Sequence, residues 1–330
     1  MQTKSTVTAE PAGSGDPPDA VPRSRVRITP GRMILAVAVP VLFSGLTAQA
    51  QQPAGDPQTS WSLSITPAHQ FSANLDAGGD VEVSRVSLAA SAMRQIDPDL
   101  QVGMNLNYQF DDWKFGNPAA FGNVAPWADI QRTGIGLKIG YAVNENWQLS
   151  LAPSVQWAGE SGARWADALT YGAVLSATRT FRPGLTLGMG AAVFREIDET
   201  NFYPYLAVSW NITDRLKLSN PPGAGPAGPG GLELSYALNN GRELGFGASY
   251  RRYRFRLDQN GPSLGGIGEA DAVPVFFRVS QFLDKSARID LYAGAMVAGK
   301  LSVENPNGGG KISEDYGTAP FVGITLGARF

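Results

Sequence analysis

The sequence predicts an all-β fold, namely a single up-and-down antiparallel transmembrane β-barrel of about fourteen strands, with twelve strands as the alternative. Three observations predict it. Segments of roughly ten residues alternate apolar with small or polar side chains. Long and short connections alternate between these segments, and an export signal precedes them.

The first 50 residues form the first predicted domain, an N-terminal extension that ends in a signal peptide. An apolar stretch at 33–46 is followed by Ala48 and Ala50, which form an A-x-A cleavage pattern. An N-terminal membrane anchor is the alternative, but the apolar core is short and Pro40 interrupts it. Residues 51–60 are a short polar lead-in, and residues 61–330 are the predicted barrel. The basic residues before the apolar stretch are Arg23, Arg25, Arg27 and Arg32.

The stretch Leu100 to Asp111 is the clearest strand, because successive side chains of a strand point to opposite faces. In a soluble sandwich its apolar face would pack on a second sheet, whereas in a membrane barrel it would face lipid. One strand does not separate these folds. One face carries Leu100, Val102, Met104, Leu106, Tyr108 and Phe110, and the other carries Gln101, Gly103, Asn105, Asn107, Gln109 and Asp111.

A second strand, from Trp147 to Trp157, favours the membrane barrel. Both tryptophans fall on its apolar face, ten residues apart. With a rise of about 3.3 Å per residue and a tilt near 40°, they stand roughly 25 Å apart along the membrane normal. This spacing matches an aromatic girdle at each edge of the lipid-facing band, although two core tryptophans are the alternative.

The connections provide the strongest argument for a barrel. Tight turns rich in Pro, Asn, Gly and Asp alternate with longer connections, as in barrels with short periplasmic turns and long external loops. An even number of strands puts both termini on the periplasmic side. The glycine-rich connections near 220–230 and 308–310 are expected to be flexible external loops. The predicted strands are 61–72, 80–93, 99–111, 130–142, 146–158, 168–181, 184–195, 201–212, 214–219, 231–239, 242–257, 273–283, 287–303 and 318–330.

The last strand ends on Phe330, with Leu326 and Ala328 on the same face. It resembles the C-terminal signal of bacterial outer-membrane barrels, which the barrel-assembly machinery reads. This resemblance implies the cell outer membrane of a Gram-negative-type bacterium as the location. The partners it implies are that machinery, the lipid bilayer and lipopolysaccharide.

Two further stretches resemble an uncharacterised, Gly- and aromatic-rich family of outer-membrane barrels. They are Asn201-Phe202-Tyr203-Pro204-Tyr205-Leu206, followed by Trp210, and Gly231-Leu232-Glu233-Leu234-Ser235-Tyr236. The motifs are short, and the family brings no known activity. The resemblance therefore implies the fold and the location only.

The composition argues against most enzyme and metal sites. The chain has no cysteine, and its one histidine, His69, is followed by Ser72 and Asp76 at a spacing that matches no known catalytic motif. We therefore expect no catalytic residues, no metal site and no cofactor. The net charge of −2 and the absence of a long basic run argue against a nucleic-acid partner.

A basic cluster is the one candidate site. The phase of the outer residues changes between Tyr250 and Tyr253, which predicts a β-bulge at Arg251–Arg252. Tyr253, Phe255 and Leu257 would then face outward. A charged side chain facing lipid costs about 2–4 kcal/mol at the midplane, so the arginines are expected in the lumen. The predicted cluster is Arg252, Arg254, Arg256, Arg278 and Arg288, with Glu233 and Asp290 as acidic partners.

Two functions follow from this cluster. A positive wall would suit a pore or transport channel for small, anionic solutes. Arginines that are paired with acids would instead fill a narrow lumen, as in a structural or surface-interaction barrel. A barrel enzyme is the remote alternative.

Overall fold

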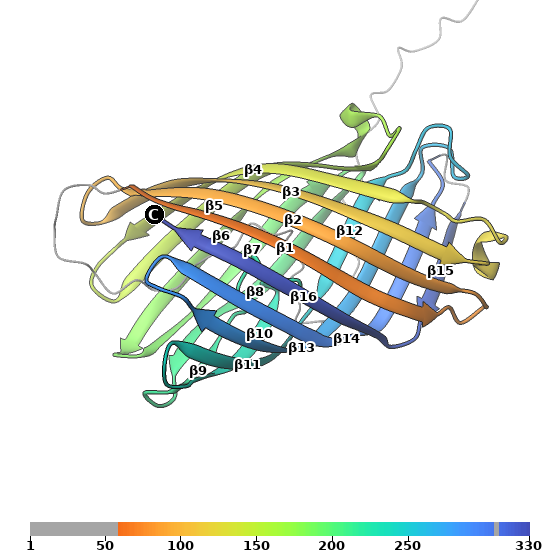
Figure 1. Cartoon of the computed structure of the whole chain (residues 1–330). Helices are drawn as coiled ribbons and strands as arrows, with labels where there is room; N and C mark the ends of the chain where they lie inside the picture. The colour runs from red at the N-terminus through yellow and green to blue at the C-terminus, as the bar shows by residue number, and fades with distance from the viewer. Residues whose placement is uncertain (1–58, 307–309) are drawn as a thin grey trace, which may run out of the picture. The chain divides into compact units, whose positions relative to one another are not determined.

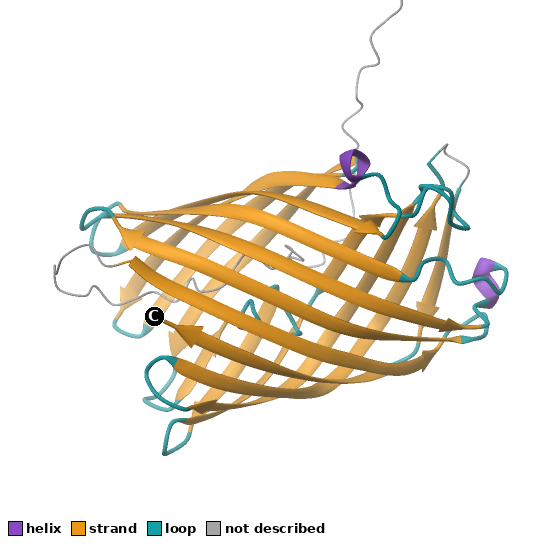
Figure 2. Ribbon diagram, turned by 45° about the horizontal axis from the view of Figure 1, so that its top comes forward, coloured by secondary structure: helices purple, strands orange, loops and turns teal. Residues whose placement is uncertain are grey.

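The computed structural model describes residues 59–306 and 310–330. The predicted extension, signal peptide and cleavage site, with Ala48 and Ala50, lie outside the described residues, as do residues 51–58 of the lead-in. Most of the described chain is β-strand, and very little of it is helix (Figure 2). Within it, no helix has the length and apolar character needed to cross a membrane.

The strands follow one another along the chain as antiparallel neighbours. The two short 3-10 helices are η1 (Ala119–Phe121) and η2 (Trp165–Ala168). The strands are β1 (Thr59–Asn74), β2 (Asp80–Gln95), β3 (Leu100–Gly116), β4 (Asp129–Ala142), β5 (Trp147–Glu160), β6 (Leu169–Arg182), β7 (Leu185–Glu196), β8 (Glu199–Asn211), β9 (Leu216–Ser219), β10 (Gly231–Ala237), β11 (Arg242–Ser249), β12 (Arg251–Arg256), β13 (Ile267–Phe282), β14 (Ala287–Glu304), β15 (Lys311–Tyr316) and β16 (Ala319–Arg329).

These strands form a closed antiparallel barrel of 14 strands, which confirms the predicted fold (Figure 1). The ring runs from β1 to β11 and then through β13, β14 and β16, and β16 pairs with β1. Strand β12 continues β11 along β13, and β15 continues β16 along β14. The two backbone hydrogen bonds between Phe330 and Trp61, at 2.9 and 3.0 Å, complete the seam.

The outer face of the barrel is apolar, as the alternation predicts, and its interior combines polar side chains with a cluster of buried aromatic and aliphatic ones. On β3, Met104 and Leu106 are 42% and 48% exposed, whereas Gln109 and Asp111 are 3% and 0% exposed. Large apolar side chains are exposed in the same way on nearly every strand. A continuous apolar outer surface on a closed barrel is the signature of a lipid-facing wall. The protein is an outer-membrane β-barrel whose outer face contacts the lipid bilayer.

The connections segregate into a turn end and a long-loop end. The turn end, which includes the C-terminus at the left of Figure 1, holds the tight turns. Several turns share one device, in which an Asp or Asn side chain accepts hydrogen bonds from the backbone two and three residues later. Asp97, Asn144 and Asp284 each do so at 2.6–3.0 Å.

Three predicted boundaries differ from the structure at the long-loop end. The connection expected at 304–317 contains β15. The loop expected at 258–272 is shorter, because β13 already begins at Ile267. The strand expected at 242–257 breaks at Tyr250 into β11 and β12. In the first two cases, pairing with the long strand β14 extends β-structure into a segment whose own sequence reads as a loop.

The expected bulge at Arg251–Arg252 was wrong. Ala248 pairs with Val275 and Arg251 with Ala272, so the register along β13 does not slip between β11 and β12. Instead, β12 turns into the lumen and reaches the opposite wall, where its end pairs with β5. Both faces of β12 are therefore buried inside the barrel, which explains why its apolar and basic residues fit no simple inside–outside pattern.

Where β12 leaves the wall, β8 has few partners on that side. Strand β9 is only four residues long and pairs with β8 over Ser209–Asn211. The side chain of Asn220 continues this pairing, because it accepts from Val208 N and donates to Leu206 O at 2.9 and 3.0 Å. Pro204 lies just before this part of β8. Proline has no N–H to donate and is therefore found mainly on edge strands.

Candidate functional site

The connection between β9 and β10, residues 220–230, lies inside the barrel, and the expectation of a flexible external loop was wrong. We call it the lumen segment. Ala227 is 1% exposed, and Pro226 and Gly228 are also buried. Strands β9 and β10 are short, so the connection starts and ends halfway up the wall and enters the lumen directly.

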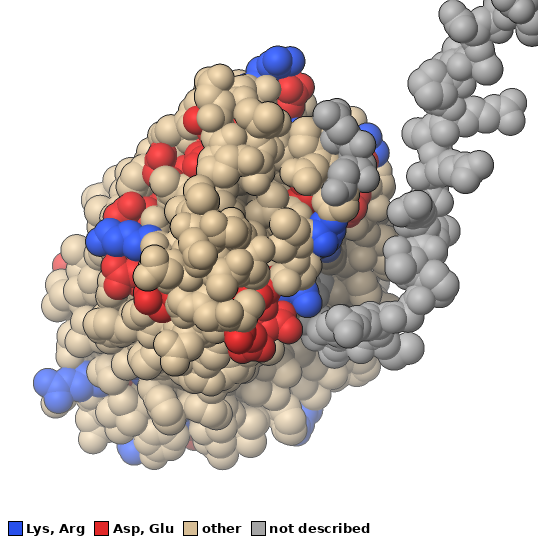
Figure 3. Space-filling view, turned by 90° about the vertical axis from the view of Figure 1, so that its right-hand side faces the viewer, with Lys and Arg blue, Asp and Glu red and all other residues tan. Residues whose placement is uncertain are grey.

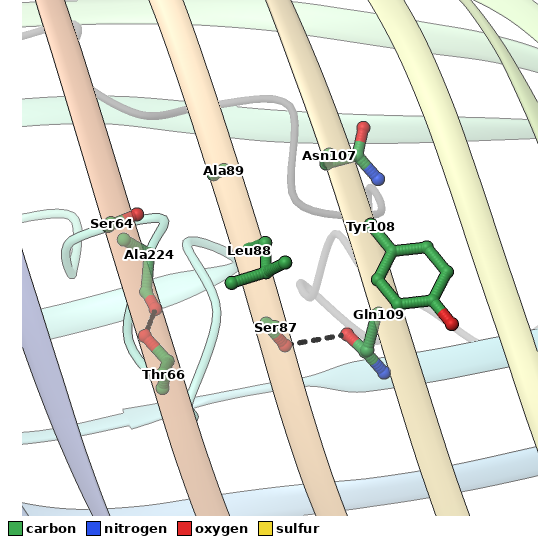
Figure 4. A pocket seen from close by; sticks show the side chains of 9 residues that line it. All are labelled: Ser64, Thr66, Ser87, Leu88, Ala89, Asn107, Tyr108, Gln109 and Ala224. Carbon is green, nitrogen blue, oxygen red and sulfur yellow. Dashed lines mark hydrogen bonds between the residues drawn. The ribbon is translucent and has the colours of Figure 1, made fainter.

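Three strands hold the lumen segment through its carbonyl groups. Thr66 of β1 donates to Ala224 O at 2.6 Å, which Figure 4 shows from close by. Ser249 of β11 donates to Ala227 O at 2.5 Å, and Arg251 of β12 donates to Pro226 O. Four prolines and two short turns, at Pro222–Gly225 and Gly225–Gly228, restrict the segment itself.

A cavity of about 290 Å³ occupies the turn-end half of the lumen. Small polar side chains of β1, β2 and β3 line its wall, and its inner end is formed by Pro222 and Ala224 of the lumen segment. The charged residues of its lining are Lys138, Lys285, Arg288 and Arg329, against Asp284 and Asp290. The lumen segment therefore forms part of the wall of a cavity whose charged lining residues, four basic and two acidic, are positive on balance.

The predicted basic cluster falls into two groups. Arg252, Arg254 and Arg256 share one face of β12, which looks toward the ends of β7 and β8. Arg254 contacts Glu269 of β13, and Glu199 of β8 and Glu304 of β14 lie 3.7 and 3.4 Å away. The other two pair with acids of the same region: Arg252 with Glu269 at 3.0 Å and Arg256 with Asp198 at 3.4 Å.

The second group lies in the turn-end half, on β10, β11, β13 and β14. Arg278 contacts Glu233 and lies 2.5 Å from Glu243 and 3.5 Å from Asp290. Arg288 also pairs with Asp290, at 2.6 Å. Sequence reasoning placed Glu233 and Asp290 beside these arginines, and the structure brings the four together. The two groups are ion-paired and do not form one continuous positive wall.

A third group, which sequence reasoning missed, surrounds Asp111 of β3. This carboxylate is fully buried and accepts from Arg85 of β2 at 2.6 Å and from Arg132 of β4 at 2.7 Å. Tyr253 packs against both guanidinium groups, at 5.2 and 3.8 Å from its ring centroid, and Arg251 lies at 4.7 Å. The sequence held one signal for this group: Arg85, Asp111 and Arg132 all fall at inward-facing positions of three adjacent strands.

The expectation that Tyr253, Phe255 and Leu257 face outward was therefore wrong. Phe255 is fully buried and packs edge-on against Trp127, with centroids 5.2 Å apart. Leu257 is 1% exposed. Because β12 keeps its register while entering the lumen, these residues face the inner wall of β2, β3 and β4.

His69 lies on the outer face, in a row with Ser84 and Asp112 of the neighbouring strands. Its Nδ1 is 3.0 Å from Ser84 Oγ, and its ring meets Phe71 edge-on. In a catalytic triad the acid orients the histidine, whereas here the serine lies between the histidine and the acid. Among the described residues, no group of three or more His, Asp or Glu side chains is placed to hold a metal ion.

The predicted girdle and assembly residues lie on the outer surface. Trp147 is 40% exposed and Trp157 is half-buried, and both are on the outer face of β5. Phe330 is 70% exposed and Leu326 is 43% exposed, and Ala328 pairs with Leu63 of β1. Acidic side chains gather in several groups on the face at the long-loop end, with basic ones beside them (Figure 3).

Two family models match the chain. One, described as MltA-interacting protein MipA, matches residues 30–164. The other, Domain of unknown function (DUF6268), matches residues 102–306, which is more than half of the chain. The chain belongs to the DUF6268 family. No curated protein matches the chain.

Several solved structures of outer-membrane proteins are similar to this DUF6268 member. The COG4313 outer membrane channel from Pseudomonas putida F1 is 9% identical, with a TM-score of 0.45 over 85% of this chain and 98% of that one. The P. putida toluene transporter TodX is 10% identical, with a TM-score of 0.41 over 84% and 91%. The KdgM porin in complex with oligogalacturonate is 10% identical, with a TM-score of 0.32 over 79% and 97%. At these TM-scores the likeness adds nothing to the fold seen in the chain itself.

Proposed function

We propose that the protein is an outer-membrane channel for small anionic solutes, and that the lumen segment closes it in this structure. The observation that carries the proposal is that the segment lies inside the barrel, where Pro222 and Ala224 line the cavity. A barrel whose lumen served only as a core would be filled by side chains of its wall. Here a separate connection enters the lumen and is held there by side-chain contacts to its carbonyl groups.

Anionic solutes are supported by the charges around the closure. More basic than acidic side chains line the cavity on one side of the lumen segment. On the other side, Arg85 and Arg132 share the single carboxylate of Asp111, and Arg251 lies beside them over the Tyr253 ring. Charged groups that line a pore set its ion selectivity, so a surplus of arginine and lysine favours anions.

Conductance tests this proposal. The refolded mature protein is compared in planar bilayers with a variant in which residues 222–229 are replaced by a short glycine–serine linker. We expect rare or small openings for the wild type and steady, anion-selective conductance for the variant. Equal conductance in the two proteins, with both folded, would refute closure by the lumen segment.

A structural barrel with a filled lumen is the second candidate. The buried network of Arg278 with Glu233, Glu243 and Asp290 favours it, because this network links four strands across their inner faces. Under this alternative, neither protein in the comparison conducts. We propose no catalytic role, since the order of the His69 row differs from that of a catalytic triad.

We further propose that the first 50 residues direct export and that cleavage follows Ala50. Phe330, with Ala328 and Leu326, would be read by the barrel-assembly machinery, and the outer rim would contact lipopolysaccharide. The turn end would then face the periplasm. The exposed aromatic end of β16 and the short, regular turns support this orientation.

A further inference from the structure

We propose that the arginines around Tyr253 form a binding site for a small oxyanion of the phosphate class. The site comprises Arg85, Arg132 and Arg251, with Asp111 and Tyr253 between them. It lies where β12 crosses the lumen and meets the lumen segment, because Arg251 donates to Pro226 O. As a step in permeation the site rests on the proposed channel function, whereas the binding itself does not.

The charge balance is the first argument. The guanidinium groups of Arg85 and Arg132 share the carboxylate of Asp111, and that of Arg251 lies over the same Tyr253 ring; each of the three arginines is at most 9% exposed. Arg251 has no carboxylate within ion-pair distance among the residues that the structure describes. Arginine cannot lose its proton in a protein, so the three arginines and Asp111 together carry a net charge of +2. A buried charge needs a compensating charge, which an anion would supply.

The second argument is that the unsatisfied polar atoms around the site are donors. Nε and Nη2 of Arg132 have no hydrogen-bond acceptor, although Arg132 is 2% exposed. The indole nitrogens of Trp113 and Trp127 lack acceptors as well. Each unsatisfied buried donor costs about 1–3 kcal/mol. An oxyanion offers several acceptor oxygens at once and would satisfy donors that a cation or an apolar ligand would leave unpaired.

These donors belong to one packed cluster. Trp113 and Trp127 meet edge-on with centroids 5.7 Å apart, and Trp127 packs on Phe255. The guanidinium of Arg132 lies 5.7 Å from the Phe255 ring and 3.8 Å from the Tyr253 ring. The aromatic rings hold the guanidinium in place and exclude water. A fixed guanidinium fork matches the paired oxygens of phosphate better than a single spherical ion.

The proposal is tested with the mature full-length chain refolded in detergent and with inorganic phosphate as the probe. Thermal unfolding and calorimetric titration are compared in phosphate and in chloride at equal ionic strength. We expect saturable phosphate binding that raises the melting temperature of the wild type, since a ligand stabilises the state that binds it. In Arg251→Gln we expect binding at least tenfold weaker. Arg256→Gln, which removes a lumen arginine that is already paired with Asp198, serves as the matched control and should bind phosphate like the wild type.

Asp111→Asn is a second test variant, to be used if Arg251→Gln does not fold. This variant removes the carboxylate that competes with phosphate for Arg85 and Arg132, so we expect a larger rise in melting temperature on adding phosphate than in the wild type. Absence of saturable binding to the wild type, or equal stabilisation of wild type and Arg251→Gln, would overturn the proposal. Phosphate binding, together with no conductance even in the variant with residues 222–229 replaced, would leave the site standing and refute the channel. Steady conductance of that variant, with no phosphate binding to the wild type, would leave the channel standing and refute the site.

Discussion

The side-chain tethers of the lumen segment provide a quantitative test of closure. Thr66→Val and Ser249→Ala remove the hydrogen bonds to Ala224 O and Ala227 O, which are 2.6 and 2.5 Å long. A hydrogen bond within a protein contributes about 1 kcal/mol net. Loss of both should therefore favour the open state by about 2 kcal/mol, which is roughly a 30-fold change in the ratio of open to closed channels.

Single-channel recording measures this ratio as the open probability. Thr66 also bonds Thr325 at 2.9 Å within the wall, so Thr325→Val is the matched control. It removes the wall contact and leaves both tethers in place. We expect an open probability like that of the wild type for Thr325→Val and a strong increase for the double variant. Equal open probabilities in all three proteins would refute the role of the tethers.

Other predictions concern the barrel itself. Unheated and boiled samples should migrate differently on SDS gels, because a closed barrel pairs its backbone around the ring; identical migration would contradict the closed wall. Leu175→Arg, at an outer position 58% exposed, should destabilise the barrel in vesicles by about 2–4 kcal/mol if it lies near the bilayer midplane, and an unchanged folding free energy would argue against lipid contact there. Deletion of Phe330 should reduce assembly into the outer membrane, measured as surface-exposed, heat-modifiable protein; a normal yield would exclude Phe330 as a signal. Glu233→Gln should destabilise the barrel by up to about 3–5 kcal/mol in denaturant titrations, because Arg278 loses a buried partner, and a change within error would show that the network contributes little.

The fold could be predicted because each wall strand carries its own inside–outside pattern. The alternation from Leu100 to Asp111 records one lipid-facing and one lumen-facing side, and no distant contact is needed to read it. The tight turns were equally local, since Asp97, Asn144 and Asp284 determine them by bonding to the next few residues. The alternation depends on which face of a strand meets lipid, and the turns depend on residues close in sequence. Both can therefore be predicted from the sequence alone.

The candidate site could be predicted only in part. Arg278, Glu233 and Asp290 lie on regular wall strands, and parity alone places them in the lumen. Tyr253 and Phe255 were assigned to the wrong face, because the assignment assumed that β12 stays in the wall. The inward path of β12 and of the lumen segment depends on the short lengths of β9 and β10 and on contacts with β1 and β5, which are distant in sequence.

A reversible disulfide cross-link between the lumen segment and the barrel wall tests most directly whether the segment closes the channel. The chain has no cysteine, so Thr66→Cys combined with Ala224→Cys introduces one defined pair where β1 contacts the segment. We predict that oxidation abolishes the channel openings in planar bilayers and that a reductant restores them in the same membrane. Thr66→Cys alone should not respond to either reagent. Openings that persist unchanged in the oxidised, cross-linked protein would contradict closure by the lumen segment.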